Sequence, residues 1–293
     1  MSGYSDGYWW SPDGLRLHYR DYARNGGAGD DGRPPLLCLP GLTRNARDFE
    51  PLAGRLAGEW RLICPDMRGR AESAYAKDAM TYVPLTYLQD ISRLLADLAI
   101  TRFVAVGTSL GGVITMLIAA THKEWLAGAL LNDVGPVLDE GGLARIRSYV
   151  GVGQSHPTWV HAARALADAN GDVYPGYDLE QWLAMAKRLY RLNSGGRVVL
   201  DYDMKIAEPI RAMGSEAGVD MWPVMQAFQG VPTLLLRGER SDLLSAATAQ
   251  RMAEGIGDSV ELTTVPGVGH APALDEPESV AAIDRLLDRV LHG

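Results

Sequence analysis

The chain has 293 residues, of which 47% are hydrophobic, and it carries a formal net charge of −8 at pH 7. That length and apolar content suffice to bury a core in one large domain or two small ones. The acidic balance and the lack of a long basic run argue against nucleic acid and anionic membranes as partners. No apolar run reaches the roughly 18 residues that a membrane-spanning helix needs.

The cysteines and histidines predict a location and argue against a metal centre. Cys38 and Cys64 both lie inside apolar runs, which indicates buried, reduced thiols and therefore a cytoplasmic protein. The opening residues lack the basic and apolar regions of a secretory signal, in agreement with this location. Neither a metal-ligand spacing nor a glycine-rich phosphate loop is found, so we expect no metal and no cofactor. A small-molecule substrate is the expected partner, and the oligomeric state stays open between monomer and homodimer.

The first half of the chain alternates strand and helix patterns. Residues 8–22 predict two strands joined by a turn at Pro12-Asp13-Gly14. After them, short apolar runs predict buried strands, and apolar residues at helical spacing predict helices between them. The strands are expected within 34–40, 60–66, 102–106 and 126–133, and the helices within 47–59, 85–100 and 110–120. This alternation predicts an α/β fold, with a mostly parallel sheet and helices on both faces.

The alternation stops near residue 135 and resumes near residue 227. The residues between read mainly as helices, within 140–152, 158–170, 178–192 and 215–228, with one weak strand pattern at 195–203. Afterwards strands are expected within 231–242 and 259–267, and helices within 245–256 and 277–291. We therefore predict an α/β core formed by 1–135 and 227–293, and a helical cap formed by 136–226.

The strand at 102–106 leads into Gly107-Thr108-Ser109-Leu110-Gly111, and an apolar helix pattern follows. A G-x-S-x-G sequence between a strand and a helix is typical of a nucleophile elbow, a tight turn that exposes the serine hydroxyl. Both glycines are expected because a side chain at either position would clash in this turn. Residues 3–7 also match the pattern, but no strand precedes them and no helix follows, so we interpret that copy as chance. Ser109 is therefore the predicted nucleophile.

A serine needs a base to take its proton and a carboxylate to orient that base. His270 is the best candidate base, since it lies in a turn-rich stretch directly after the last predicted strand. Two carboxylates follow strands and compete for the orienting role. Asp242, after the strand within 231–242, is favoured over Asp133, which ends the strand at 126–133. The order Ser109, Asp242, His270 is the chain order of one known triad arrangement.

An oxyanion hole needs two convergent N–H donors. One is expected from Leu110, directly after the nucleophile, and the other from Leu42, where Gly41 allows close approach of the backbone.

Five blocks of the chain resemble the α/β-hydrolase fold superfamily, namely 37–53, 64–73, 106–112, 234–242 and 267–278. The resemblance implies an eight-stranded sheet, mostly parallel with an antiparallel strand near the start, and a helical cap inserted after the sixth strand. It also implies Ser109 as nucleophile, Asp242 as acid, His270 as base, and Leu42 and Leu110 as oxyanion amides. Two positions depart from the common pattern. Pro40 stands where many relatives have histidine, and Ala71 stands at a usual glycine.

The leading hypothesis is a serine hydrolase that cleaves a small, fairly apolar carboxylic ester or lactone through an acyl-enzyme. Aromatic residues of the cap, among them Trp159, Trp182 and Tyr190, are candidates for the substrate pocket. One alternative is a carbon–carbon bond hydrolase of ring-cleavage products. Such relatives place Asn before the nucleophile and Trp after the histidine, whereas this chain has Thr108 and Ala271. Another alternative is a non-catalytic ligand receptor, which loss of a triad member would indicate.

Overall fold

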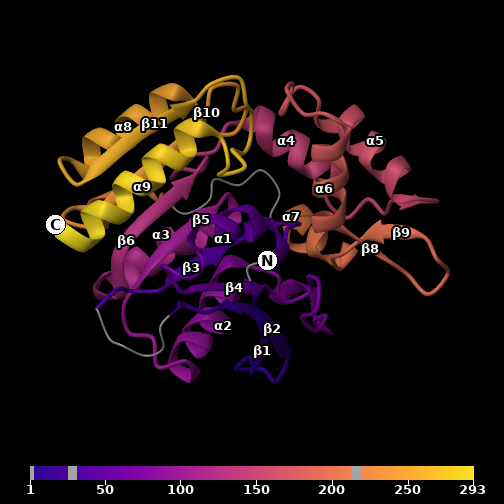
Figure 1. Ribbon diagram of the computed structural model, residues 1–293, viewed down its shortest axis with the longest axis horizontal. Helices are drawn as coiled ribbons and strands as arrows, with labels where there is room; N and C mark the ends of the chain where they lie inside the picture. Colours follow the sequence, from indigo (N-terminus) through magenta and orange to yellow (C-terminus); the bar gives the residue numbers. More distant parts are fainter. Residues whose placement is uncertain (1–2, 26–31, 213–219) are drawn as a thin grey trace.

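The computed structural model describes residues 3–25, 32–212 and 220–293. Its main sheet has eight strands in the order β1-β2-β4-β3-β5-β6-β10-β11 (Figure 1). Strand β2 pairs antiparallel with β1 and β4, and the remaining neighbours pair parallel. The strands are β1 Ser5–Trp10, β2 Arg16–Tyr22, β3 Leu36–Leu39, β4 Leu62–Asp66, β5 Phe103–Thr108, β6 Leu126–Asn132, β10 Thr233–Gly238 and β11 Val260–Val265. The predicted α/β fold and its sheet are confirmed.

Helices cover both faces of this sheet, because the buried strands alternate their side chains between two apolar cores. The helices of the sheet domain are α1 Glu50–Leu56, α2 Pro84–Asp97, α3 Leu110–Thr121, α8 Ala246–Ile256 and α9 Pro277–His292. In β3, Leu37 and Leu39 join the core under α2 and α3, whereas Leu36 and Cys38 join the core under α1 and α9. No helix in the described ranges is long and apolar enough to cross a membrane.

The elements between β6 and β10 form most of a second body beside the sheet, on the right in Figure 1. Helices α5 and α6 pack on each other around their own apolar core, which includes Ala163, Trp182 and Met185. A three-stranded sheet of order β7-β9-β8 accompanies them. The elements are α4 Glu140–Tyr149, β7 Ser155–His156, α5 Trp159–Asn170, α6 Leu179–Leu189, β8 Tyr190–Leu192, β9 Val198–Leu200 and α7 Ala207–Ala212.

Short 3-10 helices complete the chain, and one of them bears on the predicted boundary of the cap. These are η1 Ala46–Phe49, η2 Ala79–Thr81, η3 Lys123–Trp125, η4 Met204–Ile206 and η5 Trp222–Phe228. In η5, Met225 and Phe228 are buried in the core of the sheet domain. The division at 136–226 stays a prediction, and this packing favours an end a few residues earlier. The start of the helix expected at 215–228 lies outside the described residues.

Candidate active site

Ser109 lies at the turn from β5 into α3, in a backbone conformation that side chains rarely adopt (φ 52°, ψ −113°). Both flanking glycines are required by close packing. A Cβ on Gly107 would lie 2.5 Å from the carbonyl oxygen of Gly111, and one on Gly111 would lie 1.9 Å from that of Leu39. The strained turn therefore holds the serine hydroxyl out at the end of a buried strand, as the elbow motif predicts.

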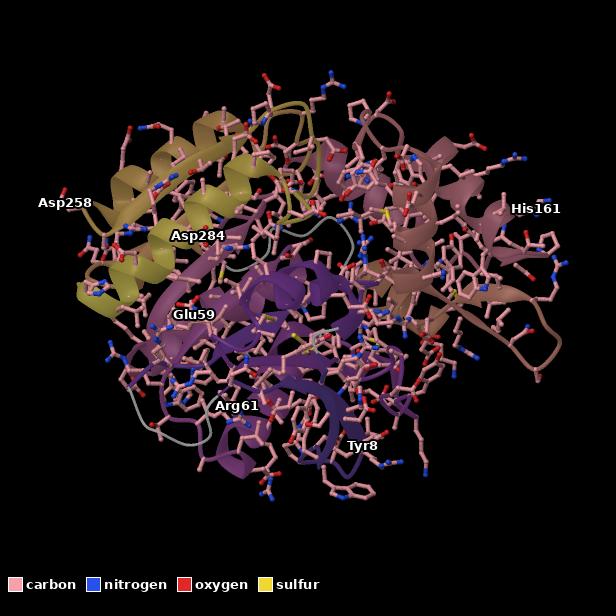
Figure 2. All side chains as sticks on the ribbon, in the orientation of Figure 1. Tyr8, Glu59, Arg61, His161, Asp258 and Asp284 are labelled. Atoms are coloured by element: carbon pink, nitrogen blue, oxygen red, sulfur yellow. The ribbon has the colours of Figure 1, made fainter. Side chains whose placement is uncertain are left out.

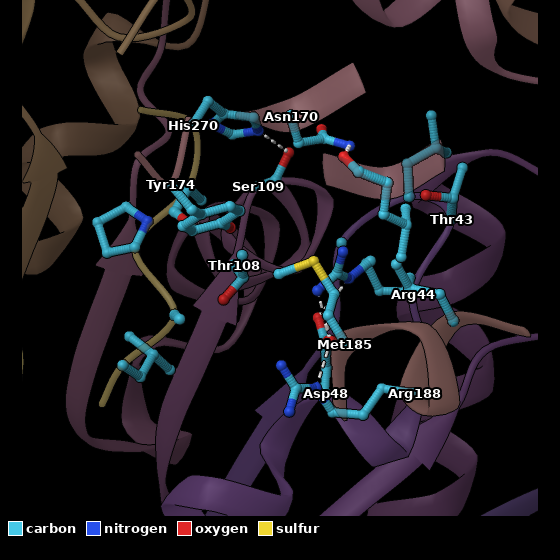
Figure 3. A pocket seen from close by; sticks show the side chains of 18 of the residues that line it. Thr43, Arg44, Asp48, Thr108, Ser109, Asn170, Tyr174, Met185, Arg188 and His270 are labelled. Carbon is cyan, nitrogen blue, oxygen red and sulfur yellow. Dashed lines mark hydrogen bonds and ion pairs between the residues drawn. The ribbon is translucent and has the colours of Figure 1, made fainter. Parts of the chain in front are cut away.

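His270 lies in the loop after β11 and points at this serine (Figure 3). Its Nε2 is 3.0 Å from Ser109 Oγ, and its side chain is only 9% exposed. The structure therefore brings the predicted base within hydrogen-bond distance of the predicted nucleophile. By contrast, His161 in α5 is exposed and projects from the outer side of the second body (Figure 2).

The carboxylate that holds His270 is Asp133, and the prediction of Asp242 for this position is wrong. His270 Nδ1 is 2.8 Å from Asp133 Oδ2, and the Asp133 side chain is fully buried. The other oxygen of Asp133 accepts from the backbone N–H of Gly238, and Ser241 Oγ donates to Oδ2. Asp133 thus has the neighbours that a fixed, charged orienter needs.

Asp242 forms a different ion pair. Both its oxygens accept from Arg145 of α4, at 2.6 and 2.9 Å, and its side chain is 40% exposed. The hydrogen bonds from Arg145 lower the pKa of Asp242 below its ordinary value. The two carboxylates follow neighbouring strands, β6 and β10, so strand position alone does not separate them.

Asn132 is a structural residue that the sequence analysis did not single out. Its Nδ2 donates to the carbonyl of Pro272 at 2.9 Å and to Thr108 Oγ1 at 3.1 Å. From the second body, the hydroxyl of Tyr174 donates to the carbonyl of Ala271. These bonds tie the histidine loop to the elbow and to the second body, and a polar residue ending the apolar strand β6 was the available signal.

The two predicted oxyanion donors are the backbone N–H groups of Leu42 and Leu110. Leu110 is the first residue of α3 and Leu42 lines the cavity beside Ser109, and among the described residues neither backbone N–H has a backbone acceptor. The fully buried Arg70 fixes the Leu42 segment, since its Nε and Nη2 donate to the Leu42 carbonyl at 3.0 and 2.7 Å. An oxyanion hole needs backbone donors of this kind, and the role of these two N–H groups stays a prediction.

A cavity of about 120 Å³ opens at Ser109 between the sheet domain and the second body. Apolar side chains contribute part of its wall, among them Phe49, Ile146, Leu166, Met185 and Leu189. Charged side chains contribute another part, namely Arg44, Asp48, Arg145 and Arg188 (Figure 3). The site is therefore small and mixed in character, with a positive bias.

The three aromatic residues predicted for the pocket do not line this cavity. Trp182 is 5% exposed and packs edge-on against Tyr174 and Tyr177 inside the core of the second body. Trp159 packs against the same core, and the hydroxyl of Tyr190 donates to Gln154. These side chains hold the second body together, because a body of that size needs large apolar groups to form a core of its own.

Comparison with known proteins places this geometry in a family. Residues 36–283 match the profile of the alpha/beta hydrolase family. The chain belongs to this family. It is 34% identical over 280 residues to the 3-hydroxybutyrate-oligomer hydrolase of Cupriavidus necator, covering 92% of each protein. It is 27% identical over 258 residues to the 2-(acetamidomethylene)succinate hydrolase of Mesorhizobium japonicum, covering 87% of this chain and 88% of that one.

Solved structures agree with the family assignment. The crystal structure of an alpha/beta hydrolase from Novosphingobium aromaticivorans is 60% identical and superposes with a TM-score of 0.92, covering 99% of both chains. With hydrolases among its relatives and the family's fold, this alpha/beta hydrolase is an enzyme of the hydrolase class. In the described parts of the chain, no cluster of three or more metal-ligating side chains is found.

Proposed function

We propose that this alpha/beta hydrolase is a serine hydrolase that cleaves a small carboxylic ester or lactone through an acyl-enzyme. The supporting observation is the continuous chain of hydrogen bonds from Ser109 Oγ through His270 to the buried Asp133, at the edge of a cavity. A nucleophile, a base and an orienting carboxylate in mutual contact are what activates a serine hydroxyl.

In the proposed first step, Ser109 Oγ attacks the carbonyl carbon of the substrate while His270 Nε2 takes the hydroxyl proton. Asp133 holds the other ring nitrogen, which fixes the tautomer and stabilises the imidazolium. The carbonyl oxygen becomes an oxyanion, and the N–H groups of Leu42 and Leu110 donate to it. Collapse of this intermediate expels the alcohol, which takes the proton from His270.

In the second step a water molecule attacks the acyl group on Ser109. His270 takes a proton from this water, and the same two N–H groups stabilise the second oxyanion. Its collapse breaks the bond to Ser109 Oγ, which takes the proton back from His270, and the free acid leaves. Ser109, His270 and Leu42 line the cavity, and Asp133 is linked to it through His270, which supports this scheme.

The small cavity and its apolar side chains support a short acyl chain or a short alcohol. The similarity to a 3-hydroxybutyrate-oligomer hydrolase supports short esters of hydroxy acids as the first substrates to test. A cytoplasmic location stays a prediction; it agrees with the two buried free thiols, Cys38 and Cys64.

The test combines a fluorophosphonate probe with a panel of short-chain p-nitrophenyl esters, lactones and linear 3-hydroxybutyrate dimers. We expect the wild type to be labelled and to turn over at least one class, and Ser109→Ala to lose both. Labelling without turnover of any ester or lactone would favour the carbon–carbon hydrolase or the receptor. A wild type that neither labels nor turns over would overturn the proposal.

A further inference from the structure

Of the three arginines in the cavity wall, Arg145 pairs with Asp242, and the other two, Arg44 and Arg188, lie beside a single carboxylate, Asp48. Arg44 donates to both oxygens of Asp48, from Nε and Nη2, at 2.7 Å each. Arg188, near the end of α6, reaches the same carboxylate only at 3.9 Å from Nε to Oδ1, beyond hydrogen-bond distance (Figure 3). Both oxygens of Asp48 therefore accept from Arg44, and Arg188 has only a longer ion pair with the same carboxylate, so these three side chains carry one net positive charge.

The guanidinium of Arg188 contains a buried donor without an acceptor. Its side chain is 13% exposed, its Nε is buried, and no described residue accepts a hydrogen bond from that atom. Leaving a buried donor without a hydrogen bond is costly. Among the described residues that line the cavity, Asp48 alone is acidic, and both its oxygens already accept from Arg44. An acceptor supplied by a ligand would remove this cost.

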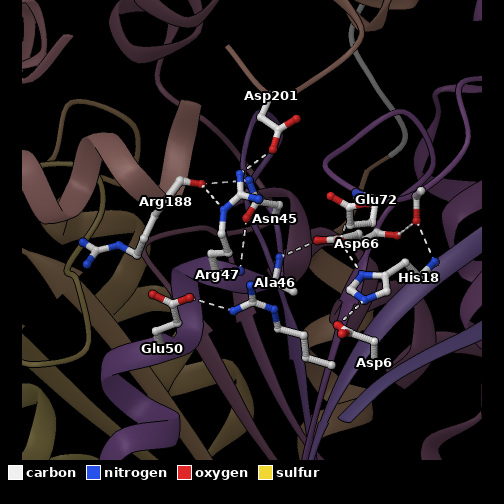
Figure 4. A network of polar contacts seen from close by, with 12 residues as sticks. Asp6, His18, Asn45, Ala46, Arg47, Glu50, Asp66, Glu72, Arg188 and Asp201 are labelled. Atoms are coloured by element: carbon white, nitrogen blue, oxygen red, sulfur yellow. Dashed lines mark hydrogen bonds and ion pairs between the residues drawn. The ribbon is translucent and has the colours of Figure 1, made fainter. Parts of the chain in front are cut away.

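The backbone of Arg188 is fixed by hydrogen bonds from the sheet domain. Its carbonyl oxygen accepts from Asn45 Nδ2 and from Arg47 Nε, both at 3.0 Å, and Arg47 in turn pairs with the buried Asp201 (Figure 4). The start of α6 is fixed as well, because Asp178 and Gln181 form a reciprocal capping box. The arginine thus projects into the cavity from an anchored helix end, as a preorganised binding group does.

The same cluster lies next to the nucleophile. A Cβ built on Gly41 would be 3.3 Å from Cγ of Arg44 and 3.8 Å from Cβ of Ser109. The stem of Arg44 and the side chain of Ser109 therefore lie on either side of Gly41, and Arg44, Arg188 and Ser109 line one cavity.

We infer that the substrate of this site carries a free carboxylate, and that Arg188, assisted by Arg44, binds it while Ser109 attacks an ester bond a few atoms away. This inference rests on the proposed serine-hydrolase function. A guanidinium pairs with a carboxylate through two parallel hydrogen bonds. One surplus positive charge matches a monoanion, whereas a phosphate monoester carries about −1.5 to −2 at pH 7. The expected substrate class is a short ester of a hydroxy acid whose terminal acid is unesterified.

The test is binding of a matched pair of ligands to the Ser109→Ala protein, in which the ester is not cleaved. The pair is the linear 3-hydroxybutyrate dimer as its free acid and as its methyl ester, measured by calorimetry. We expect the acid to bind at least about tenfold more tightly than the methyl ester, the ratio that corresponds to about 1.4 kcal/mol. Adding Arg188→Gln should bring the two affinities together, and adding Arg188→Lys should restore part of the difference.

Lys187 provides the matched control, since it is the neighbouring cation on α6 but is exposed. Ser109→Ala with Lys187→Gln should keep the preference for the acid. Equal affinity for acid and methyl ester in Ser109→Ala, or an unchanged preference after Arg188→Gln, would overturn the inference. If Arg188→Gln does not fold, the acid–ester comparison and the lysine variant still decide.

Fluorophosphonate labelling and turnover of the wild type are measured in parallel and report on the proposed function alone. Arg188-dependent binding of the acid without labelling or turnover would keep the carboxylate site and refute the serine-hydrolase function. Labelling and turnover without a preference for the acid would do the opposite.

Discussion

The cavity has one wall built by the sheet domain and one built by the second body, and the two are fixed in different ways. On the sheet side, Ser109, Asp133 and His270 follow three strands, β5, β6 and β11, and hydrogen-bond to one another. On the other side, α6 brings Met185 and Arg188, and it packs with α5 around an apolar core of their own. The comparison suggests that strand ends determine the chemistry, while a separately packed body determines which substrate reaches it.

The largest effect should come from breaking the sheet side at Asp133. Asp133→Asn removes the charge that orients His270, and we expect kcat to fall on the order of 10³- to 10⁴-fold. Asp242→Asn is the matched control, because that carboxylate pairs with Arg145 instead, and kcat should change by no more than about threefold, as an exposed ion pair contributes little. Steady-state kinetics on the best ester from the panel measures both. The reverse ranking would restore Asp242 as the orienting acid.

In the second body, substitution of Trp182 should lower the stability of the protein without removing a contact to the substrate. Trp182→Ala empties a large volume in the core around α5 and α6, and we expect a loss of about 3–5 kcal/mol in the free energy of unfolding. Trp10→Ala is the control, since Trp10 is 61% exposed and its removal should cost about 0.5 kcal/mol or less. Urea unfolding measures both variants. A stable Trp182→Ala protein with a raised KM would instead mark this tryptophan as a substrate contact.

A smaller effect on the sheet side is expected at Arg70, which touches no substrate but holds the carbonyl of Leu42. Arg70→Lys keeps the buried charge but cannot donate two hydrogen bonds in the same geometry to the Leu42 carbonyl, so the backbone at Leu42 should shift. We expect kcat to fall about 10- to 100-fold, less than the roughly 10²- to 10³-fold cost of deleting an oxyanion donor. KM should stay nearly constant, because the oxyanion forms only in the transition state. A folded variant with unchanged kcat would show that Leu42 is not positioned by Arg70.

The sequence predicts the sheet side of the site better than the other side for a physical reason. The elbow is local: Gly107, Ser109 and Gly111 lie within five consecutive residues, and their packing requires that pattern. His270 follows the last strand, so its position at the sheet edge follows from the order of elements. The choice between Asp133 and Asp242 depends on which of two adjacent strand ends the loop after β11 approaches, and this is a tertiary fact.

The cavity residues of the second body are harder to predict from the sequence, because residues of the same apolar types form both its core and its side of the cavity. Trp182 and Met185 lie three positions apart on the same helix, yet only Met185 lines the cavity while both join the core. Arg188 does not lie in any of the motifs that the sequence analysis identifies. Its significance depends on Asp48, 140 positions earlier in the chain, having already been paired by Arg44. Such a surplus charge becomes visible only when the contacts are known.

The smallest expected effect is on the stability of the sheet domain and not on its chemistry. It comes from His18 in β2. Burial lowers the pKa of His18, but hydrogen bonds to Asp66 at 2.6 Å and Asp6 at 2.9 Å outweigh it, so the pKa is raised overall (Figure 4). A raised folded-state pKa gives stability that is fully present below the unfolded value of about 6.5 and is lost as the pH rises through the folded value. Urea unfolding at a series of pH values between about 5 and 9 should therefore show a decline that His18→Gln lacks. Asp6→Asn should weaken this decline only in part, since Asp6 is 57% exposed and screened by water, whereas Asp66 is buried. An identical pH profile in the wild type and His18→Gln would place the pH dependence of the fold elsewhere.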